Sequence, residues 1–216
     1  IYRNIQKFIF FLLSSNMGLL VAVFVVSFFG KWPPLTPLMI LWINLVTNGL
    51  PALALGVDPP DEHLMTEPPR RADDGLLLRR DYVGMLYVGV VMGAAAIALY
   101  AMAPAGNEEG LAHARAMAFS LLALSPLFHA WSCRSPVMSV LSSRPLISIP
   151  LVLAVAASAA IHLVAVLVPA LRPVFRTFPM TSNEWLVLLA LSGLIIPAVE
   201  VAKIVYRRIY PDEVRA

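Results

Sequence analysis

Residues 38–61 read LMILWINLVTNGLPALALGVDPPD, and this stretch decides the fold. Its apolar part is about as long as the roughly 20 residues that a helix needs to cross a bilayer. Three polar residues interrupt it, and Asn44, Thr47 and Asn48 stand at the spacing i, i+3 and i+4. Side chains at that spacing share one face of a helix. The stretch therefore predicts a membrane-spanning helix with a polar face.

Gly49 and Pro51 follow this polar face directly. Pro51 has no N–H group, and its ring clashes with the carbonyl of Thr47, while Gly49 lets the chain leave helical geometry. We expect an unwound stretch in mid-membrane, with free carbonyls beside amide and hydroxyl oxygens. Two interpretations fit such a stretch. It is an ion site on a discontinuous helix, or a proline kink whose polar side chains hydrogen-bond to neighbouring helices.

The composition of the whole chain agrees with a membrane location. The 216 residues are 59% hydrophobic and 13% charged, and the mean hydropathy is +0.79. Charged residues make up about 25% of ordinary soluble proteins, so a soluble enzyme, a nucleic-acid-binding module and a disordered tail are excluded. A β-barrel fits poorly, because the apolar runs are unbroken. The sequence predicts an all-α polytopic membrane helix bundle.

Six segments are apolar enough to span a membrane. We predict a single membrane domain over residues 1–216, with spans at about 8–29, 35–56, 82–103, 112–132, 146–168 and 184–206. No internal repeat is visible, which argues against a transporter built from inverted repeats. The lone cysteine, Cys133, excludes an internal disulfide.

Charge predicts the orientation of these spans. An even number of spans returns both termini to one side of the membrane. That side carries twelve of the sixteen lysines and arginines, and the other side carries Lys31, Arg115, Arg172 and Arg176. Cytoplasmic loops hold the excess of positive charge. We therefore expect an integral plasma-membrane protein with both termini and the 57–81 loop in the cytoplasm.

Few other polar residues lie within the predicted spans. Asn16, in the first span, either makes a helix contact or faces the same cavity as the polar face of the second span. Glu200 is the only acid well inside a span, and we expect it to pair with Lys203 one turn on. His162 is expected to hydrogen-bond between helices, and Pro126 to kink the fourth span.

Three segments carry a resemblance to a known family. IYRNIQKFIFFLLSSN (1–16), NLVTNGLPALALGVDPPD (44–61) and MTEPPRR (65–71) resemble the C-terminal membrane half of P-type (E1–E2) cation-transporting ATPases, closest to the calcium-pump branch. The resemblance implies that the chain holds the last six of ten membrane helices of a longer pump. It further implies that the parent chain uses ATP and Mg²⁺, and that upstream phosphorylation, nucleotide-binding and actuator domains are partners besides the lipid bilayer.

The same resemblance implies a set of metal ligands. The positions that match the family's cation ligands are Asn16, Asn44, Thr47 and Asn48, with a further ligand on a proline-kinked helix upstream. Leu19, Asn48 and Pro126 stand where the family has acids, whereas Ca²⁺ prefers six to eight oxygens that include carboxylates. Three explanations fit the missing acids. An acid from outside this chain completes the site, the site binds a different cation, or the pump is degenerate.

The chain contains none of the pump's catalytic motifs. No DKTG phosphorylation motif and no TGE dephosphorylation motif occurs in it. We expect no catalytic residue, no cofactor site and no ATP hydrolysis by these residues alone, and no nucleic-acid partner. The predicted role is to supply part of the ion pathway in spans one and two. The alternative is a stand-alone six-span protein, channel-like or scaffolding, derived from a pump.

Overall fold

The computed structural model describes residues 2–29, 33–59, 75–77, 79–102, 108–135, 138–142, 145 and 147–209. These residues form helices and connections without a strand, so the predicted all-α class is confirmed. The elements in chain order are α1 (Tyr2–Phe29), α2 (Pro37–Trp42), the π-helix η1 (Ile43–Thr47), α3 (Gly49–Gly56), α4 (Arg79–Met102), α5 (Glu108–Ser132), the short 3₁₀ turn η2 (Val140–Ser142), α6 (Ile149–Leu167), the 3₁₀ turn η3 (Pro169–Leu171), α7 (Arg172–Phe175), α8 (Ser182–Gly193) and α9 (Ile195–Ile209).

Six helical segments are long and apolar enough to cross a membrane, as the sequence predicted. They are Tyr2–Phe29, Pro37–Gly56, Arg80–Met102, Glu108–Ser132, Ile149–Leu167 and Ser182–Arg208. The first begins six residues earlier than the predicted start at residue 8, because its opening turns carry Asn4, Gln6 and Lys7. Hydropathy marks only the apolar part of a helix and misses a polar extension of the same helix.

The sixth span is divided into two helices. α8 ends at Gly193 and α9 begins at Ile195, with Leu194 between them. Pro197, in the first turn of α9, cannot donate to the carbonyl of Gly193, so one hydrogen bond of a continuous helix is missing here.

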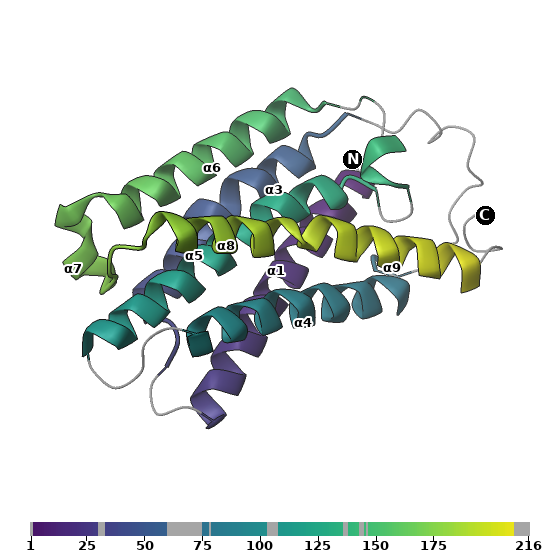
Figure 1. The fold of residues 1–216 in the computed structure, drawn as a ribbon. Helices are drawn as coiled ribbons and strands as arrows, with labels where there is room; N and C mark the ends of the chain where they lie inside the picture. Colours follow the sequence, from purple (N-terminus) through teal and green to yellow (C-terminus); the bar gives the residue numbers. More distant parts are fainter. Residues whose placement is uncertain are drawn as a thin grey trace.

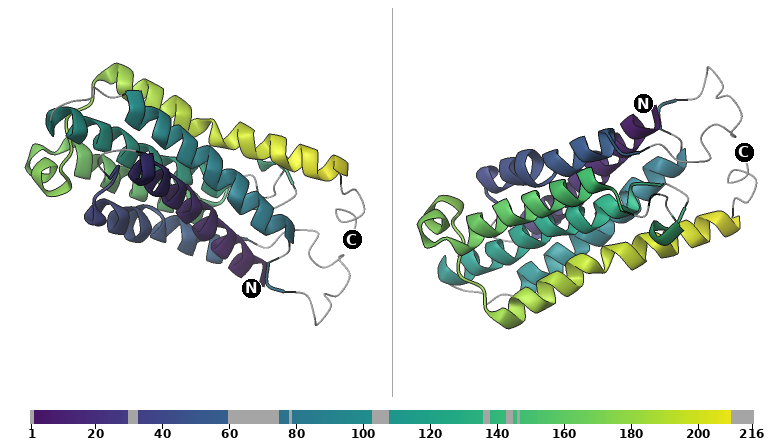
Figure 2. Two further views of the ribbon diagram at one scale, coloured as in Figure 1. Left: turned by 90° about the horizontal axis from the view of Figure 1, so that it is seen from below. Right: turned by 90° about the horizontal axis from the view of Figure 1, so that it is seen from above.

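The helices form an elongated bundle around α5. In the apolar part of α5, 78% of the residues are buried, a far larger share than in any other span. α5 contacts α4, α6, α8 and α9, while α1 packs against α3 and α4. The first turn of α1 and the last turn of α9 lie at the same end of the bundle (Figures 1 and 2).

Glycines bring α1 and α4 into close contact. A Cβ atom at Gly93 would lie 2.6 Å from Cγ1 of Val21 and 3.1 Å from the carbonyl oxygen of Gly18. At Gly89 the added atom would lie 2.4 Å from Cγ of Met17. Small residues permit such close helix packing in membranes, where van der Waals contact replaces the hydrophobic effect.

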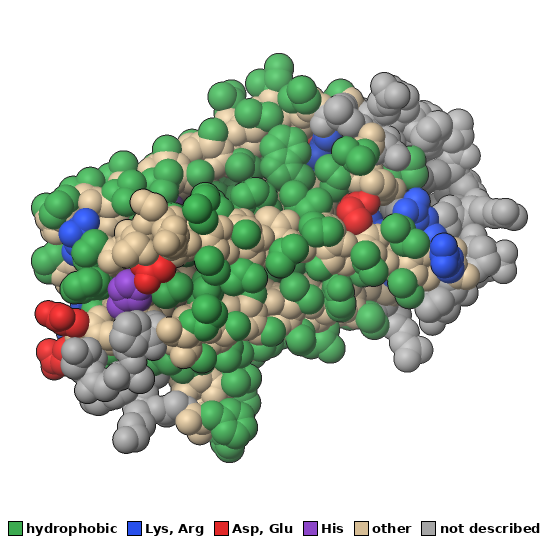
Figure 3. All heavy atoms as spheres, in the orientation of Figure 1, with side chains coloured by type: hydrophobic (Ala, Val, Ile, Leu, Met, Phe, Trp, Pro, Cys, Tyr) green, Lys and Arg blue, Asp and Glu red, His purple; other side chains and the backbone are tan. Residues whose placement is uncertain are grey.

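The surface of the bundle is apolar along its flank and charged at its two ends. Hydrophobic side chains cover most of the face in Figure 3, and the charged groups gather near the ends of the helices. This arrangement suits a protein surrounded by lipid, since charges are costly in hydrocarbon. Residues 60–74 of the 57–81 loop, with Arg70 and Arg71, lie outside the described residues.

Candidate cation site

The second span stays helical where an unwound stretch was predicted, and that expectation was wrong. The N–H of Asn48 donates to the carbonyl of Ile43 at 2.9 Å, five residues back, in a π-helical turn. α3 then begins at Gly49, which places Pro51 in a first turn, where a missing N–H costs nothing. The wide turn of η1 absorbs the disturbance that proline introduces, so the backbone does not open. Single π-turns inside helices occur often at functional sites.

Two polar side chains at this turn are fully buried. Thr47 and Asn48 are both 0% exposed. The Thr47 hydroxyl donates to the carbonyl of Ile43 at 2.7 Å, so its oxygen keeps free lone pairs. Neither amide atom of Asn48 has a hydrogen-bond partner within the described structure, and the same holds for Oδ1 of half-buried Asn44. A buried amide without a partner costs on the order of 1–3 kcal/mol, and such a group calls for an explanation such as a water or an ion.

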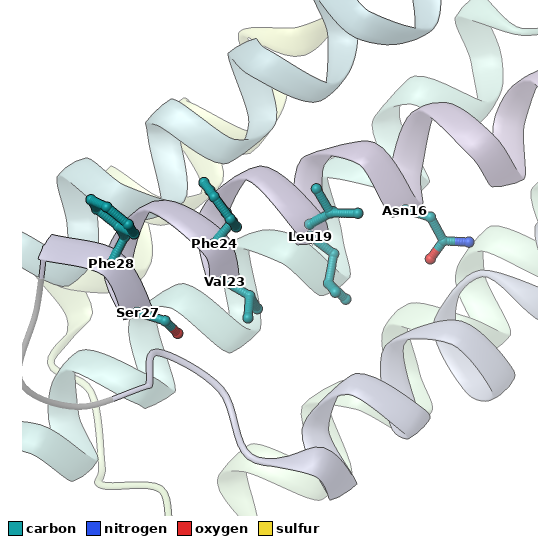
Figure 4. A pocket seen from close by; sticks show the side chains of 7 residues that line it. Asn16, Leu19, Val23, Phe24, Ser27 and Phe28 are labelled. Carbon is teal, nitrogen blue, oxygen red and sulfur yellow. The ribbon is translucent and has the colours of Figure 1, made fainter.

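Asn16 lies on α1, in an open groove with a volume of about 590 Å³. Figure 4 shows it at one end of a row of α1 side chains, with Phe28 at the other end. All lining residues come from α1: Asn16, Leu19, Leu20, Val23, Phe24, Ser27 and Phe28. The groove occupies the exposed face of this helix, since Leu20 is 58% and Phe24 is 65% exposed.

Asn16 and Asn48 are a similar number of residues away from one contact at the end of the bundle. Lys7 of α1 contacts Asp58, just after α3, with 2.8 Å between Nζ and Oδ2. Asn16 is nine residues from Lys7 and Asn48 is ten residues from Asp58, which at 1.5 Å per residue gives about 14 Å and about 15 Å from this contact. Asn44, Thr47 and Asn48 lie on η1 and its cap, and Asn16 lies on α1 at a similar number of residues from this contact. That all four share one cation remains a prediction.

The site carries no negative charge of its own. Within the described ranges, no three His, Cys, Asp or Glu side chains gather in a way that could hold a metal ion. Leu19 lines the groove one turn from Asn16, and Pro126 is buried inside the unbroken helix α5. The positions that are acidic in the family that the sequence resembles are thus apolar or neutral in this chain. η1 offers amide, hydroxyl and carbonyl oxygens only.

The other polar residues of the spans have mixed outcomes. The predicted pair is confirmed, with 3.1 Å between Lys203 Nζ and Glu200 Oε1. The expected interhelical hydrogen bond of His162 is wrong, because neither ring nitrogen has a partner among the described residues. Its ring instead packs edge-on against Phe119, with 4.8 Å between centroids. Pro126 stays within a single helix, α5.

Sequence reasoning missed Asp58. Its side chain is 1% exposed and pairs with Lys7 and Arg134. It stands among several acids and prolines in the predicted cytoplasmic loop 57–81, and nothing in that composition marks it as buried. The usable signal was its position directly after the apolar residues of α3, where a carboxylate is still close to the bundle.

Comparisons with known proteins agree with this architecture. Residues 32–205 match the family described as "Cation transporting ATPase, C-terminus". The chain is 37% identical to a calcium-transporting ATPase of Bacillus subtilis, over 90% of this chain and 22% of that protein. It is 31% identical to an endoplasmic-reticulum-type calcium-transporting ATPase of Arabidopsis thaliana, over 96% of this chain and 25% of that protein. The chain spans about a quarter of the length of these relatives. It belongs to the C-terminal membrane family of the cation-transporting P-type ATPases.

Proposed function

We propose that this chain is the C-terminal membrane domain of an ATP-driven cation pump, and that η1 and Asn48 supply ligands to the transported ion. The observation that carries the proposal is Asn48, which is fully buried with both amide atoms unpartnered. A bound cation gives the carbonyl oxygen of this amide a partner. ATP and Mg²⁺ act in the phosphorylation and nucleotide-binding domains of the parent, outside these residues.

The cargo that fits best is a divalent cation, with Ca²⁺ as the first candidate. The relatives in Bacillus subtilis and Arabidopsis thaliana are named calcium-transporting. A dication in a low-dielectric site needs compensating negative charge, which η1 lacks. The open groove beside Asn16 and Leu19 leaves room for a helix from the rest of the parent, and that helix supplies the missing carboxylate.

The proposed orientation places both termini in the cytoplasm of a plasma-membrane protein. Arg207 and Arg208 lie in the last turn of α9, at the end of the bundle that also holds Lys7. Gly75→Cys should then be protected from an impermeant thiol reagent in intact cells, and Thr181→Cys should be labelled. Cys133 adds little background, because it is buried and burial raises the pKa of its thiol. The reverse labelling pattern contradicts the orientation.

The decisive experiment measures ion-stimulated ATP hydrolysis by the full-length parent across Ca²⁺, Mn²⁺, Mg²⁺, Na⁺ and K⁺. We expect one divalent ion to stimulate the enzyme, and Asn48→Ala to raise the concentration of that ion needed for half-maximal activity. Ser192→Ala is the matched control, because Ser192 is also fully buried with an unpartnered hydroxyl but lies in α8. If no ion stimulates hydrolysis, or both variants behave alike, the proposed role of η1 is wrong.

A further inference from the structure

A buried carboxylate joins three parts of the bundle at the end where α1 begins. Asp58 follows α3, and its side chain is 1% exposed. Its Oδ2 lies 2.8 Å from Nζ of Lys7 in α1, and its Oδ1 lies 3.3 Å from Nε of Arg134, which follows α5. Arg134 is itself buried and donates to the carbonyl of Pro145 at 2.7 Å. We call Lys7, Asp58 and Arg134 the charge node.

Backbone contacts strengthen the connection between α1 and α3. The side-chain amide nitrogen Nδ2 of Asn4 donates to the backbone carbonyl of Asp58 at 2.8 Å and to that of Gly56 at 3.2 Å. The first two turns of α1 therefore hold the last turn of α3 through both its backbone and its terminal carboxylate. Such a contact fixes the height of α3 along α1.

The charge node and the proposed cation site are the two ends of one short helix. α3 runs from Gly49 to Gly56, with Asn48 capping its start and Asp58 lying two residues after its end. A helix of this length behaves as a rigid rod of about 12 Å. η1, by contrast, is a wide turn whose hydrogen bonds are shifted from the regular pattern.

We propose that Asp58 is a positioning residue for the cation site, holding α3 in register with α1 and α5 so that Asn48 stays at the depth of Asn16. This inference rests on the proposed function, because its readout is the affinity for the transported cation. Asp58 does not touch the ion, since α3 separates it from Asn48. Its effect passes through α3.

The pair of Glu200 and Lys203 provides a matched control. It too joins a lysine to a carboxylate near the same end of the bundle, with 3.1 Å between Nζ and Oε1. It fastens α9 to the last residue of α5 and to the segment that follows, because Lys203 also donates to the carbonyls of Ser132 and Met138. α9 carries none of the proposed ligands. Loss of this pair should disturb the bundle with little effect on η1, because α9 is not among the elements that pack mainly against η1.

The experiment compares Asp58→Asn, Lys7→Met and Glu200→Gln in the full-length parent, in cation titrations of ATP hydrolysis. Asp58→Asn should raise the half-saturating cation concentration by roughly 2- to 30-fold, the range of coupling effects from residues that touch neither ligand. The maximal rate per folded molecule should change less. Lys7→Met keeps the pairing with Arg134 and should act in the same direction more weakly. Glu200→Gln should leave half-saturation unchanged, and Asp58→Glu should restore most of the affinity.

Each outcome decides between positioning and general structural damage. If Asp58→Asn fails to fold, Lys7→Met provides the test. Equal shifts for the charge-node variants and Glu200→Gln overturn the proposal, as does normal half-saturation in Asp58→Asn or, where that variant fails to fold, in Lys7→Met. Failure of the proposed function is distinguishable, because Asn48→Ala then has no effect on the ion dependence either.

Discussion

The polar groups of the charge node have partners, whereas the amide beside η1 has none among the described residues, although only about 15 Å separates the two regions. In the charge node every charge has a partner, with Asp58 between Lys7 and Arg134. At the end of η1 the amide of Asn48 is as deeply buried and has no partner within the described residues. The charged groups of the charge node hold helices together, whereas the amide of Asn48 is left without a partner in the described part of the chain and can bind a ligand.

Within one span, partnered polar groups therefore serve stability and unpartnered ones serve ligand binding. A buried polar group without a partner lowers stability, so its presence in a folded protein points to another use. A buried charge with partners contributes to holding one arrangement of helices, and removing a single partner leaves the others uncompensated. Substitutions in the charge node should therefore affect folding strongly and ion binding indirectly through α3, and substitutions at η1 and its cap should affect ion binding directly.

The largest effect is expected from removing the carboxylate of the charge node. Asp58→Ala removes the carboxylate that lies between the buried cationic groups of Lys7 and Arg134, and breaking a buried ion pair should cost about 3–5 kcal/mol of folding free energy. Thermal unfolding of the purified full-length protein in detergent measures this loss. Glu200→Ala is the control, because the Glu200 side chain is 19% exposed and Lys203 keeps the carbonyls of Ser132 and Met138 as partners. Equal losses in both variants contradict the special weight given to Asp58.

The seam between α1 and α4 tests how rigid the frame around η1 is. Gly93→Ala forces a methyl group to within 2.6 Å of Val21 Cγ1 and 3.1 Å of the carbonyl oxygen of Gly18, and overpacking of this kind costs typically about 1–3 kcal/mol. Gly193→Ala meets no atom within 4 Å and should be neutral or slightly stabilising, since alanine favours helix. Unfolding midpoints of the two variants measure the difference. A tolerant Gly93→Ala would mean that α1 and α4 move apart easily.

The sequence predicted the spans and not their interior geometry. Apolar runs gave six spans because burial in lipid depends mainly on composition over about 20 residues. Gly49 and Pro51 showed that the second helix is disturbed, but composition does not say how. Whether the chain unwinds or takes up a π-turn depends on packing, and here the N–H of Asn48 finds the carbonyl of Ile43. The pair of Glu200 and Lys203 was predictable, because its partners are one turn apart on one helix.

Contacts between distant residues could not be predicted in the same way. Asp58 meets Lys7 and Arg134 across 51 and 76 residues of chain, and no local pattern marks such pairs. The candidate ligands Asn44, Thr47 and Asn48 could be placed on one face from their spacing. Their relation to Asn16 depends on how α1 turns about its axis, and the groove shows Asn16 on the exposed face of that helix.

The affinity for the ion can be tested next, because a substitution can add the negative charge that η1 and its cap lack. Asn48→Asp in the full-length parent should tighten the stimulation by a divalent ion, or create it, by on the order of 1–3 kcal/mol, as for a contact to a charged group. Leu19→Glu should act in the same direction, since Leu19 lines the groove one turn from Asn16. Cation titrations of ATP hydrolysis measure both. If Asn48→Asp and Asn48→Ala both leave the ion dependence unchanged, the ion site lies elsewhere.

The smallest effect on stability is expected where the amide itself is removed. Asn48→Leu replaces two unpartnered polar atoms by an apolar group of similar size, so the relief of desolvation should offset the imperfect fit to within about 1 kcal/mol. Ser158→Ala is the comparison, because that hydroxyl donates to the carbonyl of Val46 at 3.2 Å and its loss should cost about 0.5–1.5 kcal/mol. The unfolding midpoint of Asn48→Leu should thus equal or exceed that of Ser158→Ala. In cation titrations, Asn48→Leu should show the weaker affinity of the two. A strongly destabilised Asn48→Leu protein would mean that the amide holds the fold together, and η1 would then resemble the charge node.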